Sequence, residues 1–334
     1  MSIKIFLYFS ILLSASVQFS CNSKQPVSKP KSSLDLDSLL KKHPNNVSLL
    51  IKRGNRFLDA YNYDKALSDG AKAFRLANSN FNAKFLYANA LNNRAKRSIS
   101  DVDQAKNLFL SLLKVQPGNK EVYVALASTY THQGDFENSF RYINQALKID
   151  KRYRDAYVLK GTNYVSLGNR KLAKSSYETA IQQDPSFYEG YLQLGFMYSE
   201  DNDPLSIEYF KSAATLKPKS VDALYGVGYS LQQQLRFSEA QAAYRHLLDV
   251  DPQFYLALFN QGYIKQFELN ELDSAASFYK SALQLQPSFV KAWHNLGLCF
   301  ASQGRKVDAY KAFSKALKYN PDFEISRIEA SKLK

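Results

Sequence analysis

Hydrophobic side chains recur over most of this 334-residue chain at spacings of three, four and seven, which place them on one face of an α-helix. From residue 47 to residue 323 such amphipathic segments come in pairs, and a proline or a residue in its place closes seven of the pairs. The closing positions follow one another at intervals of 33 to 35 residues, at Pro117, Lys151, Pro185, Pro218, Pro252, Pro287 and Pro321. The pattern therefore predicts a series of helical hairpins, one hairpin per period.

Two series of small residues keep the same period. One falls on the first helix of each predicted hairpin and the other on the second helix, so that the two helices approach closely where they cross. A large apolar side chain follows four residues after seven members of the second series, whereas the first hairpin has Gly70 there. The first series is Gly54, Ala88, Ala127, Gly161, Gly195, Gly228, Gly262 and Gly297, and the second is Ala66, Ala105, Ser139, Ala173, Ser206, Ala240, Ala275 and Ala309. The large residues are Phe109, Ile143, Tyr177, Phe210, Tyr244, Tyr279 and Phe313.

The last hairpin carries the most complete pattern. The positions W-x2-L-G-x2-Y, A-x3-F and P are filled in order, with Ala316 as one further match, by Trp293, Leu296, Gly297, Phe300, Ala309, Phe313, Ala316 and Pro321. On these residues the chain resembles the tetratricopeptide repeat family. The resemblance implies an all-α fold, a right-handed α-solenoid of about eight helical hairpins whose apolar faces are buried by stacking on one another.

Eight copies, called repeats 1 to 8, are expected between residues 47 and 323. Repeat 1 departs from the pattern with Arg53 in place of a leucine, and repeat 2 has five extra residues within Asn92–Ser100, which are expected to form a protruding loop. The charged amphipathic segment 324–334 is expected to form a short C-terminal capping helix over the last apolar face. The expected bounds of the repeats are 47–80, 81–119, 120–153, 154–187, 188–220, 221–254, 255–289 and 290–323.

The first twenty residues, 1–20, are predicted to be a signal peptide, with Lys4, then an apolar run, then small or neutral residues before Cys21. The stretch V-Q-F-S-C-N resembles the lipobox of bacterial lipoproteins, in a relaxed form similar to that of the Bacteroidota, and implies a lipid on Cys21. A plain secretory signal or an uncleaved anchor is the alternative. Residues 21–46 are expected to hold the lipidated cysteine, a flexible polar linker at Asn22–Ser33 and a leading segment. The protein is thus predicted to be an exported, membrane-anchored lipoprotein that faces the periplasm of a Gram-negative bacterium.

Positive charge is concentrated near this predicted anchor. Of the formal net charge of +14, residues 22–119 contribute 17 basic against 7 acidic side chains, whereas residues 120–334 carry 26 against 23. Such a charge excess either contacts anionic lipid head groups or is a merely solvated face. Nucleic acid is not an expected partner, because the basic residues are not interleaved with aromatic ones and export removes the chain from it. The candidate basic patch comprises Lys52, Arg56, Lys84, Arg94, Lys96 and Arg97.

No residue pattern predicts catalysis, a cofactor or a metal. The two cysteines, Cys21 and Cys299, form neither a disulfide framework nor a clustered metal site, and the four histidines lie in different repeats or outside them. Trp293 and Cys299 occupy or adjoin signature positions and are expected to be packed between helices. Because the repeats use residues 47–323, no stretch remains for a separate catalytic domain, and the protein is not expected to be an enzyme.

In the family, the first helix of each repeat lines a concave groove, which implies that positions 2, 5, 9 and 12 of each copy face a partner. Positions 5 and 9 are polar or apolar with one aromatic in repeats 1 to 4, and mostly aromatic in repeats 5 to 8. Aromatic side chains at such positions either hold a partner segment or pack on neighbouring helices. The candidate groove residues are Asn55, Phe85, Asn89, Phe196, Tyr225, Tyr229, Phe259, Tyr263 and His294.

These features favour a non-enzymatic envelope adaptor that binds a protein or peptide segment in its groove while a lipid tethers it to a membrane. The alternative is a structural component of an envelope or secretion assembly that uses its convex face or the ends of the solenoid. The Lys, Asn, Asn, Lys, Arg arrangement of the carboxylate-clamp members of the family is absent, so an acidic C-terminal tail is not the expected ligand.

Overall fold

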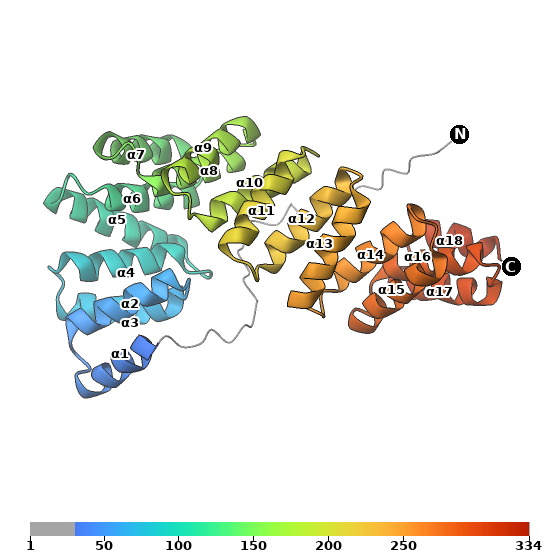
Figure 1. The fold of residues 1–334 in the computed structure, drawn as a ribbon. Helices are drawn as coiled ribbons and strands as arrows, with labels where there is room; N and C mark the ends of the chain where they lie inside the picture. Colours follow the sequence, from blue (N-terminus) through green and yellow to red (C-terminus); the bar gives the residue numbers. More distant parts are fainter. Residues whose placement is uncertain (1–30, 334) are drawn as a thin grey trace. The chain divides into compact units, whose positions relative to one another are not determined.

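The computed structural model describes residues 31–333, and all regular structure in that range is α-helical (Figure 1), which confirms the predicted all-α fold. None of these helices has the length and apolar character needed to cross a membrane. The first helices of the hairpins are α2 (Val47–Asp59), α4 (Phe81–Asn93), α6 (Lys120–His132), α8 (Arg154–Ser166), α10 (Tyr188–Glu200), α12 (Val221–Gln233), α14 (Tyr255–Phe267) and α16 (Val290–Ser302). Their partners are α3 (Tyr63–Leu76), α5 (Ile99–Val115), α7 (Phe136–Ile149), α9 (Arg170–Gln183), α11 (Leu205–Leu216), α13 (Phe237–Val250), α15 (Leu272–Leu285) and α17 (Lys306–Tyr319). The series is preceded by α1 (Lys31–Lys42) and followed by α18 (Glu324–Ser331).

Local sequence explains where many of these helices begin. The first backbone N–H groups of a helix have no partner within it, and a short polar side chain just before the helix accepts a hydrogen bond from one of them. Such a capping bond precedes α2, α3, α4, α5, α6, α7, α9 and α12. The capping residues are Asn46, Asn62, Asn80, Ser98, Asn119, Asp135, Asn169 and Ser220.

The chain divides into two compact units, Met1–Lys96 and Arg97–Lys334. The described part of the first unit contains α1 to α4, and α1 is a helix that the sequence pattern did not predict. It begins at Lys31, so the predicted linker ends before Ser33. The side chains of Leu36 and Leu40 are buried, and α1 lies against α2. The predicted signal peptide, Cys21 and the rest of the linker lie outside the described residues.

Arg53 shows why repeat 1 departs from the repeat pattern. Its Nε and Nη2 atoms donate hydrogen bonds of 2.8 and 2.7 Å to the two carboxylate oxygens of Asp69 on α3. Its Nη1 atom donates a third bond of 2.7 Å to Asp37 on α1. Asp69 is only 4% exposed, so the arginine neutralises a buried charge and also ties α1 to the first hairpin.

The extra residues of repeat 2 are divided between a loop and a helix. α4 ends at Asn93 and α5 begins at Ile99, which leaves a loop of residues 94–98, while α5 itself is 17 residues long. Ser98 starts α5 early because its Oγ accepts a hydrogen bond from the Asp101 N–H, and the Asp101 carboxylate accepts one from the Ser98 N–H. The loop is therefore shorter than the predicted range Asn92–Ser100, because part of the insertion lengthens α5.

The small residues of the repeat pattern receive large side chains from the partner helix. A Cβ atom placed on Gly195 would lie 2.7 Å from the Phe210 ring, and one on Gly228 would lie 2.6 Å from the Tyr244 ring. Both distances are shorter than real side chains allow, so glycine is needed for the helices to cross at this separation. The ring of Phe210 also contacts Gly226 of the following repeat, which joins two hairpins into one core.

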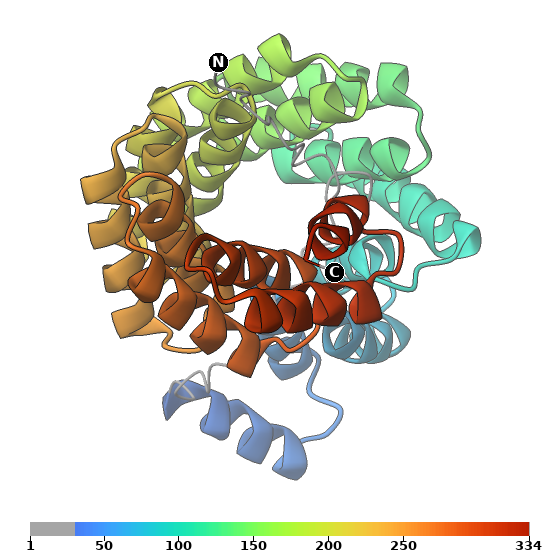
Figure 2. The ribbon, with the colours of Figure 1, turned by 90° about the vertical axis from the view of Figure 1, so that its right-hand side faces the viewer.

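Within the second unit, the hairpins follow one another round a curve (Figure 2). Each hairpin packs on the next, and the first helices α6 and α8, α10 and α12, and α14 and α16 also contact each other directly. Successive second helices in the described range make at most marginal contact. The first helices therefore form the inner side of the curve, where a partner would be surrounded by several repeats.

Candidate protein-binding groove

The predicted groove residues fall into both compact units, and each set is described separately. Asn55, Phe85 and Asn89 belong to the first unit, on α2 and α4. Asn55 is exposed, whereas Phe85 is half-buried and stacks on Phe81 with 6.4 Å between ring centroids. Asn89 is half-buried, and its backbone carbonyl accepts a hydrogen bond of 2.9 Å from the Asn93 side chain. This set is mainly polar.

In the second unit, position 9 of repeats 5 to 7 carries accessible aromatic side chains. Phe196 is 41% exposed and meets Phe210 edge-on at 5.1 Å between centroids. Tyr229 and Tyr263 are half-buried. Phe267, one turn beyond Tyr263, is 47% exposed, and its ring centroid lies 4.7 Å from that of Tyr263. Phe196, Tyr229, Tyr263 and Phe267 are called the aromatic row.

Phe267 was missed in the sequence because only positions 5 and 9 of each repeat were selected. It lies four residues after Tyr263, and residues four apart share one face of a helix. Reading one further turn of each first helix would have found it. The aromatic row therefore extends from repeat 5 to the end of α14 in repeat 7.

Position 5 of repeats 6 and 7 serves mainly to hold the helices together. Tyr225 lies 5.2 Å from the Phe254 ring, accepts a hydrogen bond of 3.3 Å from Asn260, and has its pKa raised to about 12 by burial. Phe259 packs on the rings of Phe289 at 4.8 Å and Tyr279 at 5.6 Å. Both side chains are half-buried, so they support the aromatic row more than they extend it.

His294 was predicted to face a partner, but its side chain is only 8% exposed. The capping helix α18 and the turn before it cover it: its Nδ1 atom lies 2.9 Å from the Ser326 hydroxyl, and its ring meets Phe323 edge-on at 5.6 Å. Burial lowers the pKa of His294 to about 4. The structure thus assigns His294 to the packing of the C-terminal cap, and the groove prediction is wrong for this residue.

The burial of His294 predicts a loss of stability in acid. Its pKa is about 4 when folded and near 6.5 when unfolded, so unfolding takes up a proton between these values. Stability is fully present above pH 6.5 and falls as the pH drops toward 4, by about 2 kcal/mol in urea unfolding at pH 4.5. Fluorescence of the single tryptophan, Trp293, next to this histidine, reports the transition.

Variants separate this effect from the titration of carboxylates. His294→Leu should lose about 2 kcal/mol less than the wild type between pH 7 and pH 4.5. His246→Leu, at an exposed site on α13, should retain the wild-type pH dependence. Equal acid sensitivity in the wild type and His294→Leu would contradict the assignment.

The candidate basic patch is also divided between the units. Lys52 and Arg56 lie one turn apart on α2, Lys84 lies on α4, and Arg94 forms an ion pair of 3.7 Å with Asp64. Lys96 ends the first unit, and Arg97 begins the second. Five of the six predicted residues therefore belong to one unit, and Arg94 among them is paired with a carboxylate.

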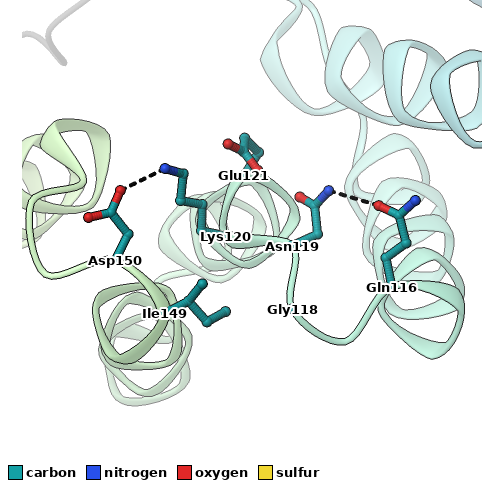
Figure 3. A pocket seen from close by; sticks show the side chains of 7 residues that line it. All are labelled: Gln116, Gly118, Asn119, Lys120, Glu121, Ile149 and Asp150. Atoms are coloured by element: carbon teal, nitrogen blue, oxygen red, sulfur yellow. Dashed lines mark hydrogen bonds and ion pairs between the residues drawn. The ribbon is translucent and has the colours of Figure 1, made fainter.

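An open hollow of about 530 Å³ lies where α5, α6 and α7 meet (Figure 3). Two pairs of its lining side chains bond to each other: Lys120 donates a 2.6 Å hydrogen bond to Asp150, and Asn119 donates one of 3.1 Å to Gln116. The Lys120 ammonium also lies 4.8 Å from the centre of the Tyr153 ring. These side chains lie at the end of repeat 2 and within repeat 3, and they present no nucleophile with an adjacent base.

The side chains with potential chemistry elsewhere are structural as well. Cys299 is fully buried, and burial raises the pKa of its thiol to about 12, which removes the thiolate that nucleophilic chemistry needs. The Trp293 indole donates a 2.8 Å hydrogen bond to the Pro287 carbonyl. Within residues 31–333, the structure brings together no cluster of three His, Cys, Asp or Glu side chains suited to a metal ion.

Comparison with known proteins agrees with this geometry. Models of the tetratricopeptide repeat match residues 120–153, 155–187, 225–288 and 290–323. Among solved structures, the C-terminal part of a TPR repeat-containing protein from Cytophaga hutchinsonii is 16% identical. That similarity has a TM-score of 0.61 and covers 73% of this chain and 98% of the other, and it shows a shared fold.

Two relatives illustrate how far the similarity extends in longer proteins. Protein O-mannosyl-transferase TMTC3 of Homo sapiens is 23% identical over 85% of this chain and 33% of its own length. Tetratricopeptide repeat-containing protein trd-1 of Caenorhabditis elegans is 28% identical over 47% of this chain and 20% of its own length. The chain thus spans a third or less of either relative.

Proposed function

Because this chain is built of tetratricopeptide repeats, a scaffold suited to protein–protein interaction, we propose that it is a non-enzymatic adaptor that holds a protein or peptide segment against its inner helices. The observation that carries the proposal is the aromatic row. Phe196 and Phe267 are 41% and 47% exposed, and they lie on the first helices α10 and α14 of the second unit. Exposed aromatic side chains supply large contact area with few rotatable bonds, which suits binding hot spots.

The reaction in the name of TMTC3 belongs to a protein of which this chain spans 33%, and it forms no part of the proposed role. Repeats of this family are generally non-catalytic scaffolds. Among the described residues, the Cys299 thiol is buried and its pKa is raised, and the Lys120 ammonium is paired with Asp150. Binding is therefore the function that the inner surface supports best.

Truncating the aromatic row should weaken partner recovery. In the triple variant Phe196→Ala, Tyr229→Ala and Tyr263→Ala, we expect recovery of co-purifying proteins to fall at least about tenfold, because each ring contributes contact area. Tyr225 and Phe259 are left intact, since their rings pack on neighbouring helices and their loss would disturb the fold. The measurement is quantitative affinity purification, with helix content checked by circular dichroism.

A matched control carries three aromatic or aliphatic truncations on second helices. Leu172 on α9 and Tyr310 and Tyr319 on α17 are 41%, 39% and 42% exposed, which is similar to Phe196. Their alanine variants should recover partners as the wild type does. If the control loses partners and the groove triple keeps them, the chain acts instead as an assembly component that uses its outer face or its ends.

We further propose that the adaptor is a lipoprotein tethered through Cys21 and facing the periplasm. The support is the sequence of residues 1–33, in which an apolar run precedes a lipobox-like cysteine and a polar segment follows it. Two or more acyl chains give lasting membrane attachment, at about 0.8 kcal/mol per buried methylene. The positive charge of residues 22–119 would then lie near anionic head groups.

Removal of the cysteine side chain tests the tether. The wild-type protein should fractionate with membranes, incorporate a clickable fatty acid and accumulate as a precursor in globomycin. Cys21→Ser should lose the label and move to the soluble fraction. A Cys21→Ser protein that still partitions with membranes would refute lipidation as the means of attachment.

A further inference from the structure

The inner helices that carry the aromatic row contain only four charged side chains, and three of them are paired. On α10, Glu189 accepts a 3.0 Å bond from Lys217, and Glu200 accepts one of 2.6 Å from Arg170. On α14, Lys265 pairs with Glu271 at 2.8 Å. The fourth, Asp222 on α12, has no ion-pair partner among residues 31–333. It is thus the uncompensated charge of this surface.

Comparison with the equivalent positions of earlier repeats explains why Asp222 has no cation beside it. In repeat 4, Arg154 precedes Asp155 and pairs with it at 2.6 Å. In repeat 5, the cation comes instead from Lys217, the residue directly after α11. Repeat 6 replaces both cations, with Val221 at the first position and Asp251 at the end of α13. Asp222 has therefore lost both of the sources that neutralise its counterparts.

Asp222 also belongs to the binding surface by its helical position. Asp222, Tyr225 and Tyr229 follow one another at spacings of three and four, which places them along one stripe of α12. The carboxylate side chain is accessible to solvent, yet the protein around it raises its pKa above the usual range. An acidic group in the first turn of a helix is normally stabilised in its charged form. Here partial desolvation by the surrounding protein outweighs that effect and raises the pKa, although the side chain still contacts solvent and has no cation beside it.

We infer that the groove of repeats 5 to 7 takes an extended segment in which a lysine or arginine pairs with Asp222 while neighbouring apolar or aromatic residues cover Phe196 and Tyr229. This inference rests on the proposed adaptor function and specifies its ligand. A cation of the bound segment would form with Asp222 the ion pair that the equivalent carboxylates of repeats 4 and 5 form with cations of this chain. The same cation would also lie near tyrosine rings, whose faces attract positive charge.

A displayed library of random decapeptides tests the inference on the purified protein. Panning against the wild type should enrich peptides with lysine or arginine near an aromatic residue, at least about threefold over the library. Panning against Asp222→Asn should remove the preference for basic residues and retain that for aromatic ones. A synthetic peptide selected on the wild type should bind Asp222→Asn about tenfold more weakly, measured by fluorescence anisotropy.

The control and the remaining outcomes separate the two proposals. Asp249→Asn, at an exposed carboxylate on the second helix α13, should select the same peptides as the wild type. Neutral or acidic peptides that depend on Tyr229 would overturn the cation inference and leave the adaptor function intact. If no peptide is enriched, or if selected peptides bind the triple aromatic variant unchanged, the groove function itself fails.

Discussion

Replacing Arg53 by alanine is expected to lower the stability of the first unit by about 3 kcal/mol, because it leaves a buried carboxylate without its counter-ion. Asp69 is 4% exposed, and both of its oxygens accept hydrogen bonds from the Arg53 guanidinium. Arg53 also holds α1 through Asp37, so α1 should detach in the same variant. Hydrogen exchange at the amides of α1 to α3 measures the effect, because the single tryptophan lies in the other unit.

Two companion variants show whether charge burial is the cause. Asp37→Ala removes a carboxylate whose side chain is 59% exposed and should cost less than about 1 kcal/mol. Arg53→Leu combined with Asp69→Ala removes both charges of the pair, restores the leucine of the repeat pattern, and should recover most of the loss. If Arg53→Ala is no more destabilising than Asp37→Ala, the buried pair does not stabilise this unit.

The helical hairpins could be predicted because their cause is local and periodic. The sequence shows the apolar spacing, the small residues at the helix crossings and the prolines between hairpins. At one such crossing, Gly195 lies against the Phe210 ring, as the pattern predicts. Helix α1 could not be predicted in this way, because its sequence is polar apart from a few leucines. It is ordered by contacts with α2 and by Arg53, which lies 16 residues beyond Asp37.

The same distinction explains the groove residues. Position 9 of the repeat is accessible in Phe196 because no neighbouring element covers it. His294 also occupies a predicted groove position, but α18 and the turn before it cover its ring. The repeat pattern does not predict this contact, because the contact requires the segment after the last repeat to pack against α16. The sequence pattern also did not predict that Asp222 lacks an ion-pair partner. That property depends on which lysine or arginine side chains lie next to the equivalent carboxylates in the folded chain.

Truncation of Phe210 is expected to cost about 3 to 5 kcal/mol, the range for removing a buried aromatic ring. The ring is 1% exposed and fills the space between Gly195 of its own hairpin and Gly226 of the next. Because a repeat contacts only its neighbours, the loss should appear first as faster hydrogen exchange in α10 to α12. Tyr319→Ala, at a site that is 42% exposed, is the matched control and should leave this exchange unchanged.

Because Gly226 lies against the Phe210 ring, we expect the effects of substitutions at these two positions to be coupled. Gly226→Ala would place a Cβ closer than 3.0 Å to the Phe210 ring and should cost about 1 to 3 kcal/mol by overpacking. With Phe210→Ala the ring is gone, so the added methyl group meets a cavity and Gly226→Ala should then be neutral or stabilising. The double variant should therefore be more stable than the sum of the single effects by at least about 1 kcal/mol. Strict additivity would show that the ring and the glycine do not meet, and that the two hairpins do not share a core at this point.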